Sequence, residues 1–139
     1  MSRDPARAAT QFFGGRVCLD FANTLDWRTS DDPQELIPDY AALLSWSERR
    51  GTLPLAATRK LRARSASSEA AAAMQTAYEL RRDIWTISDA LRDGRGAHLR
   101  LVNQLLSVAP RQPDLVRQDR AYRHALAGID LKEPLWPVL

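Results

Sequence analysis

The sequence has little of what builds a metal centre or a disulfide-bonded fold. Its 139 residues contain one cysteine, Cys18, and two histidines, His98 and His124. One cysteine cannot form an internal disulfide, which favours a reducing, cytoplasmic setting. Histidines and cysteines so few and so far apart in the sequence cannot supply a Cys₄-type zinc site. We therefore expect a domain that packing holds together, with no metal or other cofactor in this chain.

Long apolar runs and catalytic motifs are also missing. No stretch approaches the length of a transmembrane helix, and the opening MSRDPARAATQ lacks the apolar segment of a signal peptide. Neither histidine lies beside a serine or cysteine in a recognised nucleophile motif, and no phosphate-binding glycine loop occurs. A lone carboxylate such as Asp20 is weak support for a general base. We expect a non-enzymatic protein that enters no membrane.

An excess of one charge is missing as well, although the net charge is +3 and the pI is near 9.5. Residues 1–70 hold ten Lys and Arg against nine Asp and Glu, and residues 71–139 hold ten against eight. The basic cluster RKLRAR, Arg59–Arg64, fits a solvated helix face better than a phosphate-binding patch. This even mixture argues against sequence-specific DNA binding by the chain alone.

What is present fits one globular domain, since 45% of the residues are apolar. We expect a flexible tail over residues 1–11 and a single domain over residues 12–139. Gly14-Gly15 suits the turn of an N-terminal β-hairpin, and residues 114–126 favour a second hairpin over a helix. The fold class is therefore α+β, mainly α, with four or five helices. Besides a helix that begins at Cys18, the periodicity predicts helices over Pro38–Arg50, Leu55–Ala63, Ser68–Arg92 and Ala97–Val108.

The segment GGRVCLDFANTLDWR, residues 14–28, mixes apolar residues with short polar ones. On a helix from Cys18 to Arg28, one face would carry what we call the polar stripe. Asp, Asn and Thr are poor helix formers, so an ordinary solvent face would more often use Glu, Lys or Gln. The stripe is therefore either a structural hydrogen-bond network or the wall of a small polar pocket. Its members are Asp20, Asn23, Thr24, Trp27 and Arg28.

Two residues outside this segment are further candidates. Trp46 is expected in the core, with a place in the pocket wall as the alternative. Arg81 is expected either to pair with Asp20 or to bind an anionic ligand. A bidentate pair with a carboxylate would indicate a structural network, and an unpaired guanidinium would indicate a receptor. The candidate ligand-binding residues are thus Asp20, Asn23, Thr24, Arg28, Trp46 and Arg81.

The same segment resembles the N-terminal signature of the ABATE domain of CGNR zinc-finger proteins. The likeness runs over about Phe12–Leu139. It implies the sensory or regulatory domain of a stress-induced transcription regulator. The residues that carry it are Gly14-Gly15, Leu19-Asp20-Phe21, Asn23-Thr24, Arg28, Trp46, Leu80-Arg81 and Asn103.

In that family a zinc finger with a Cys-Gly-Asn-Arg motif follows the domain, and these 139 residues do not contain it. The resemblance implies that zinc and DNA are bound only through that finger. The chain is then either a fragment of a longer protein or a naturally short member. For the domain itself we expect an unknown small polar ligand. The alternative is a dimerisation or docking module, with a homodimer as partner and a purely structural polar network.

The segment EPLWPVL at the end of the sequence carries four large apolar residues and no polar residue after Glu133. Leaving that much apolar surface in water would invite association. We therefore expect the segment either to dock on its own core or to pair with a second copy. In both cases Trp136 should be substantially buried.

Overall fold

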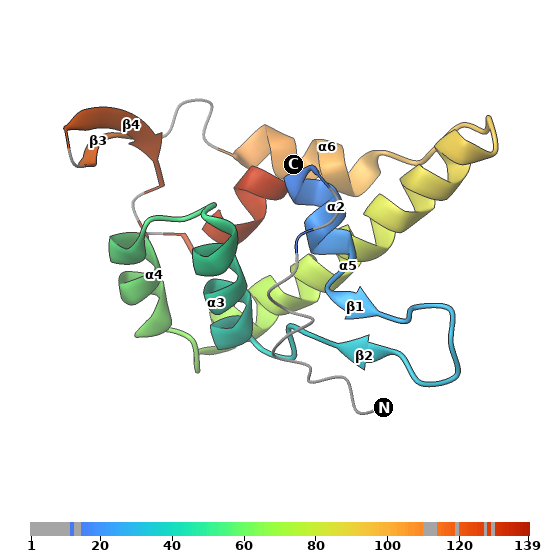
Figure 1. Ribbon diagram of the computed structural model, residues 1–139, viewed down its shortest axis with the longest axis horizontal. Coiled ribbons are helices and arrows are strands. Elements are labelled where there is room, and N and C mark those ends of the chain that lie inside the picture. Colours follow the sequence, from blue (N-terminus) through green and yellow to red (C-terminus); the bar gives the residue numbers. More distant parts are fainter. Residues whose placement is uncertain (1–11, 13–14, 110–113, 119, 127, 129) are drawn as a thin grey trace.

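The computed structural model describes residues 12, 15–109, 114–118, 120–126, 128 and 130–139. In this part of the chain five α-helices, two small antiparallel sheets and a 3₁₀-helix occur (Figure 1). The predicted class, α+β and mainly α, is confirmed. The helices are α2 (Val17–Ala22), α3 (Tyr40–Arg50), α4 (Leu55–Arg62), α5 (Ser68–Arg92), α6 (Arg100–Val108) and η1 (Glu133–Val138). The strands are β1 (Leu25–Asp26), β2 (Gln34–Glu35), β3 (Asp114–Gln118) and β4 (Ala121–Ala125).

Local capping residues explain why α3 and α5 lie close to their predicted positions. The Asp39 carboxylate accepts a hydrogen bond from the Ala42 N–H at 2.8 Å, and the Ser67 hydroxyl accepts one from the Ala70 N–H at 3.1 Å. Both satisfy N–H groups that a helix start leaves without a partner. Gly51 ends α3 with a left-handed φ of 76°, a conformation that glycine adopts at little cost.

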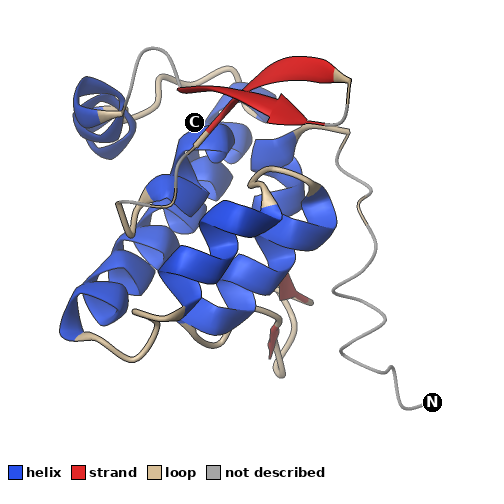
Figure 2. Ribbon diagram, turned by 90° about the vertical axis from the view of Figure 1, so that its left-hand side faces the viewer, coloured by secondary structure: helices blue, strands red, loops and turns tan. Residues whose placement is uncertain are grey.

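The long helix α5 runs across the molecule, and α2, α3 and α6 contact it directly (Figure 1). α2 and α3 pack on α5, α4 packs on α3, and η1 contacts both α2 and α3. Figure 2 shows the β3–β4 hairpin above this helical body and the small β1–β2 sheet at its lower edge. The fully buried side chains of the core include Phe21, Ile37, Leu43, Leu44, Trp46, Leu61, Leu80 and Leu135.

The C-terminal segment docks on its own domain, which is one of the two expected outcomes. Leu135 and Val138 are buried, while Trp136 is only partly buried against the same core. The Tyr40 hydroxyl donates a 2.6 Å hydrogen bond to the Leu131 carbonyl. Burial, with a smaller contribution from the Glu133 carboxylate, raises the pKa of the Tyr40 hydroxyl. The tyrosine therefore stays protonated and ties α3 to the approach of η1.

Of the two predicted hairpins, one lies where it was expected and the other does not. The second is confirmed, because β3 and β4 pair antiparallel with Asp114 opposite Ala125. The N-terminal one lies further along the chain than expected, where Leu25 pairs with Glu35 and Asp26 with Gln34. The proposed turn at Gly14-Gly15 lies partly outside the described residues, and a helix begins at Val17.

Candidate functional site

The polar stripe does not form, because α2 ends at Ala22 and not near Arg28. Asn23 is the C-cap, and the Thr24 hydroxyl donates a 2.6 Å hydrogen bond to the Phe21 carbonyl. Trp27 then takes a positive φ of 57° beyond the short strand β1. Thr24, one of the poor helix formers that made this segment unusual, favours the end of the helix here, since its side chain bonds to a nearby backbone carbonyl. The prediction of one helix from Cys18 to Arg28 is wrong.

The stripe residues divide into a buried and an exposed group. Asp20 and Thr24 are buried, whereas Asn23, Trp27 and Arg28 are exposed. The Asp20 carboxylate accepts a 2.8 Å bond from the Nε of Arg50 at the end of α3. The expected Asp20–Arg81 pair is therefore not formed, because α3 brings its own arginine to Asp20.

Trp46 lies in the core and not at the edge of a site. Its side chain is buried, with its ring 5.7 Å from the Phe21 ring and 6.3 Å from the Phe12 ring, both in edge-on geometry. Such edge-to-face contacts are favourable between aromatic rings. Of the two interpretations of Trp46, the structure supports the core residue.

Arg81 is the centre of a different polar cluster, built between α5 and β2. Its side chain is 6% exposed, and it forms two bonds with the Glu35 carboxylate: Nη1 to Oε1 at 2.8 Å and Nη2 to Oε2 at 2.5 Å. Nη1 also donates to the Thr24 hydroxyl oxygen at 2.9 Å. Arg81 therefore holds both ends of the β1–β2 hairpin against α5.

Two aromatic residues of α5 flank this guanidinium. Tyr78, Arg81 and Trp85 share one face of the helix, and the guanidinium carbon lies 5.0 Å from the Tyr78 ring and 5.7 Å from the Trp85 ring. The Tyr78 hydroxyl donates to the Ile37 carbonyl at 2.9 Å, and the Trp85 indole N–H donates to the Ala22 carbonyl at 3.0 Å. Burial, followed by the Glu35 charge, raises the pKa of Tyr78. Both rings are thus held in place at their polar ends.

Glu35 is the most exposed residue among these partners. Its side chain is 31% exposed, and its Oε1 also accepts a 3.0 Å bond from the Ile37 backbone N–H. Three N–H groups therefore converge on one carboxylate. We call Thr24, Glu35, Tyr78, Arg81 and Trp85 the Arg81 cluster.

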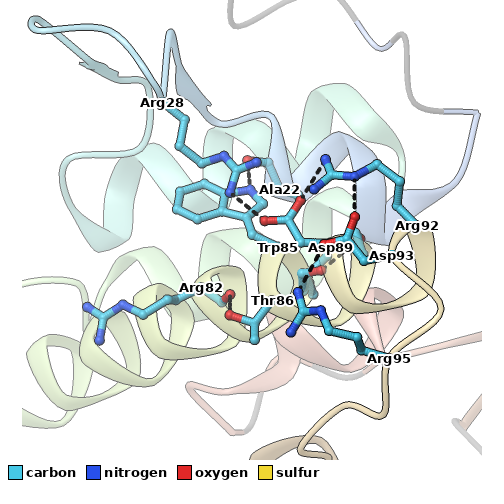
Figure 3. Close-up of polar contacts among 11 residues, drawn as sticks. Ala22, Arg28, Arg82, Trp85, Thr86, Asp89, Arg92, Asp93 and Arg95 are labelled. Carbon is cyan, nitrogen blue, oxygen red and sulfur yellow. Dashed lines mark hydrogen bonds and ion pairs between the residues drawn. The ribbon is translucent and has the colours of Figure 1, made fainter.

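The exposed part of the stripe lies beside this cluster. The Arg28 guanidinium lies 4.6 Å from the centre of the Trp85 ring, and its Nη1 is 3.7 Å from the Asp89 carboxylate (Figure 3). Asp89 also pairs with Arg92 at 3.3 Å. Trp27, the neighbour of Arg28, is 52% exposed. This face combines a large aromatic side chain with charged groups of both signs.

Four partners of Asp20 and Arg81 were not predicted. Tyr78 and Trp85 could have been found, because the predicted helix already placed them three residues before and four after Arg81. Arg50 was assigned to the end of its helix, and its partner lies 30 residues away. Glu35 had no local signal, since it lies on a strand of two residues next to a loop.

The described residues contain no set of three or more His, Cys, Asp or Glu placed to hold a metal ion. The zinc that the resemblance implies for a following finger therefore has no fitting donor set in this part of the protein. None of the helices in the described ranges has both the length and the apolar character needed to cross a bilayer. Within the same residues, every buried side-chain nitrogen and oxygen has a hydrogen-bond partner.

A family model matches residues 15–139, from just before α2 to Leu139, which follows η1, and is described as "Putative stress-induced transcription regulator". The chain belongs to the ABATE family. No curated protein and no solved structure matches it. The matched range of this ABATE domain includes every residue of the Arg81 cluster.

Proposed function

We propose that this ABATE domain is the sensory domain of a transcription regulator, and that it binds a small polar ligand at the Arg81 cluster. The observation that carries the proposal is the unequal exposure of one ion pair. Arg81 is 6% exposed, whereas its partner Glu35 is 31% exposed and lies on a two-residue strand.

The site has the composition of a binding site for a polar group. Small-molecule sites commonly combine apolar and aromatic walls with a few directed polar groups. Here Tyr78 and Trp85 supply the walls, and Arg81 and the Ile37 N–H supply donors directed at one point. A bidentate Arg–carboxylate pair by itself indicates a structural network. Because one partner reaches solvent, the same network also gives a ligand a route to the guanidinium.

A thermal-shift screen against a metabolite library tests this function. A ligand that binds only the folded state raises the melting temperature as its concentration rises. We expect hits on the wild type that disappear in Arg81→Met and persist in Arg62→Met, whose arginine pairs with Glu48 between α3 and α4. A library that leaves the wild type unshifted, or hits that survive Arg81→Met, would count against the proposal.

Self-association is a second candidate, favoured by the exposed group of the former stripe. Trp27 is 52% exposed, and Arg28 beside it lies over Trp85. Tryptophan and arginine are enriched among residues that dominate interfaces. A second copy of the chain is the partner to test. Sedimentation velocity should then show a dimer for the wild type and a monomer for Trp27→Ser; a monomer at all concentrations excludes this candidate.

A further inference from the structure

We infer that Glu35 occupies the place of the ligand, and that the ligand of the Arg81 cluster carries a carboxylate group. The inference rests on the proposed function and adds to it the chemical class and the mode of entry. The external carboxylate displaces the internal one.

The donor geometry is the first argument. Two parallel N–H···O bonds from one guanidinium to two oxygens of one group are the arrangement by which arginine recognises a carboxylate. Arg81 makes both bonds to Glu35, and the Ile37 N–H adds a third donor to Oε1. A free carboxylate that took the place of the Glu35 side chain would meet the same three donors.

The unequal cost of separating the pair is the second argument. A buried charge without a partner is strongly unfavourable, so Arg81 must keep an anion beside it. Glu35 is nearly one-third exposed and would be hydrated by a small movement away from α5. Exchanging Glu35 for another carboxylate therefore changes the free energy little, whereas leaving Arg81 without an anion is strongly unfavourable. The arrangement therefore favours replacement of the Glu35 carboxylate by another carboxylate.

Replacement would also loosen the hairpin. The Glu35 side chain connects β2 to α5, whereas the Arg81–Thr24 and Tyr78–Ile37 bonds do not involve Glu35 and would still join this segment to α5. Trp27 lies in the connection between β1 and β2. Ligand entry would thus release one anchor of the segment that presents Trp27, which gives the domain a means of signalling occupancy at its surface.

The Arg62–Glu48 pair provides a matched control within the same chain. Glu48 is 29% exposed, close to the value for Glu35, but Arg62 is 38% exposed and contacts Glu48 through Nη2 and Oε1 at 3.0 Å. Removing Glu48 leaves a hydrated arginine, while removing Glu35 leaves a buried one. Only the second should bind a replacement anion.

Chemical rescue tests the inference. Glu35→Ala and Glu48→Ala are titrated with sodium propionate, which has the carboxylate end of a glutamate side chain, and with neutral propionamide at the same ionic strength. We expect propionate to raise the melting temperature of Glu35→Ala toward that of the wild type. Propionamide should not do so, and Glu48→Ala should respond to neither. The wild type should bind propionate at least about tenfold more weakly than Glu35→Ala, because Glu35 competes for Arg81.

Glu35→Gln, which preserves the side-chain shape, gives a second variant in case the alanine variant does not fold. Equal responses of the Glu35 and Glu48 variants to propionate would overturn the inference. A larger shift with phosphate than with propionate would overturn the carboxylate class. If propionate fails while the library yields an Arg81-dependent neutral ligand, the inference fails and the proposed function stands. If propionate rescues Glu35→Ala but no library compound shifts the wild type, the proposed function fails instead.

Discussion

Arg81 on α5 and Glu35 on β2, separated by 46 residues in the sequence, form a two-bond ion pair that buries the cation and leaves the anion partly in water. The position of the β1–β2 hairpin therefore depends on a charge that belongs to the long helix. This dependence can be measured through the free energy of unfolding and through the binding of carboxylates.

Removing the two partners should have unequal effects on the free energy of unfolding. Glu35→Ala leaves a buried guanidinium without its carboxylate and should cost about 2 kcal/mol. Arg81→Met leaves a glutamate that water can hydrate and fills the space with an apolar side chain, so it should cost about 1 kcal/mol or less. Urea denaturation of both variants measures the difference. A larger loss for Arg81→Met would contradict the assigned asymmetry.

Asp20 and Asn23, both expected on one face, should now behave differently. Asp20 is buried and bound to Arg50, so Asp20→Ala should lower the free energy of unfolding by about 1–3 kcal/mol. Asn23 is exposed, and Asn23→Ala should change that free energy by less than about 0.5 kcal/mol. Equal losses in denaturation curves would mean that the Asp20–Arg50 bond contributes little.

Gly128 should be intolerant of a side chain for two separate reasons. Its φ is +79°, and a Cβ atom there would lie 2.6 Å from the Ala57 carbonyl oxygen. Gly128→Ala should therefore cost about 3 kcal/mol or more, from the backbone conformation and the clash together. Gly51→Ala is the matched control, because Gly51 has a similar φ of +76° and open space around it. Its loss should be about 1 kcal/mol. Similar melting temperatures for the two variants would show that the close approach of Ala57 to Gly128 does not contribute to the loss.

The helical part of this fold could be predicted because its signals are local. Ser67 caps the start of α5 and the DGRG segment follows its end, so the predicted range matches the observed one. Hydrophobic periodicity failed after Ala22, where the Thr24 hydroxyl bonds to the Phe21 carbonyl and competes with continuation of the helix. The predicted helix from Cys18 to Arg28 also included Leu25, which lies on β1.

The site could be predicted only in part, for a physical reason. Arg81 was predicted either to pair with a carboxylate or to bind an anionic ligand, because a guanidinium is suited to both. Which anion it meets depends on how the chain between β1 and α3 folds back, and a strand of two residues leaves no periodic pattern. From the sequence, Asp20 was the one carboxylate proposed for Arg81. In the structure α3 brings Arg50 to Asp20, and Arg81 pairs with Glu35.

Acid should weaken the contact between α3 and α4 through Glu48. A hydrogen bond from Thr58, with a further contribution from Arg62, lowers the pKa of Glu48 below its ordinary value of 4.5. A lowered pKa in the folded state adds stability that is present above pH 4.5 and lost as the pH falls through the folded-state value. Glu48→Gln should therefore lose less stability than the wild type between about pH 6 and pH 3. Parallel stability profiles for the two proteins would show that Glu48 does not contribute.

The most direct test of the central claim observes the Arg81 guanidinium itself. In protein labelled with ¹⁵N at arginine, the Arg81 side-chain signals are assigned by their absence from Arg81→Met. The account predicts that propionate added to Glu35→Ala shifts these signals saturably and leaves the Arg62 signals in place. Arg81 signals that stay fixed, or that move together with those of the exposed arginines as salt increases, would contradict a carboxylate site at Arg81.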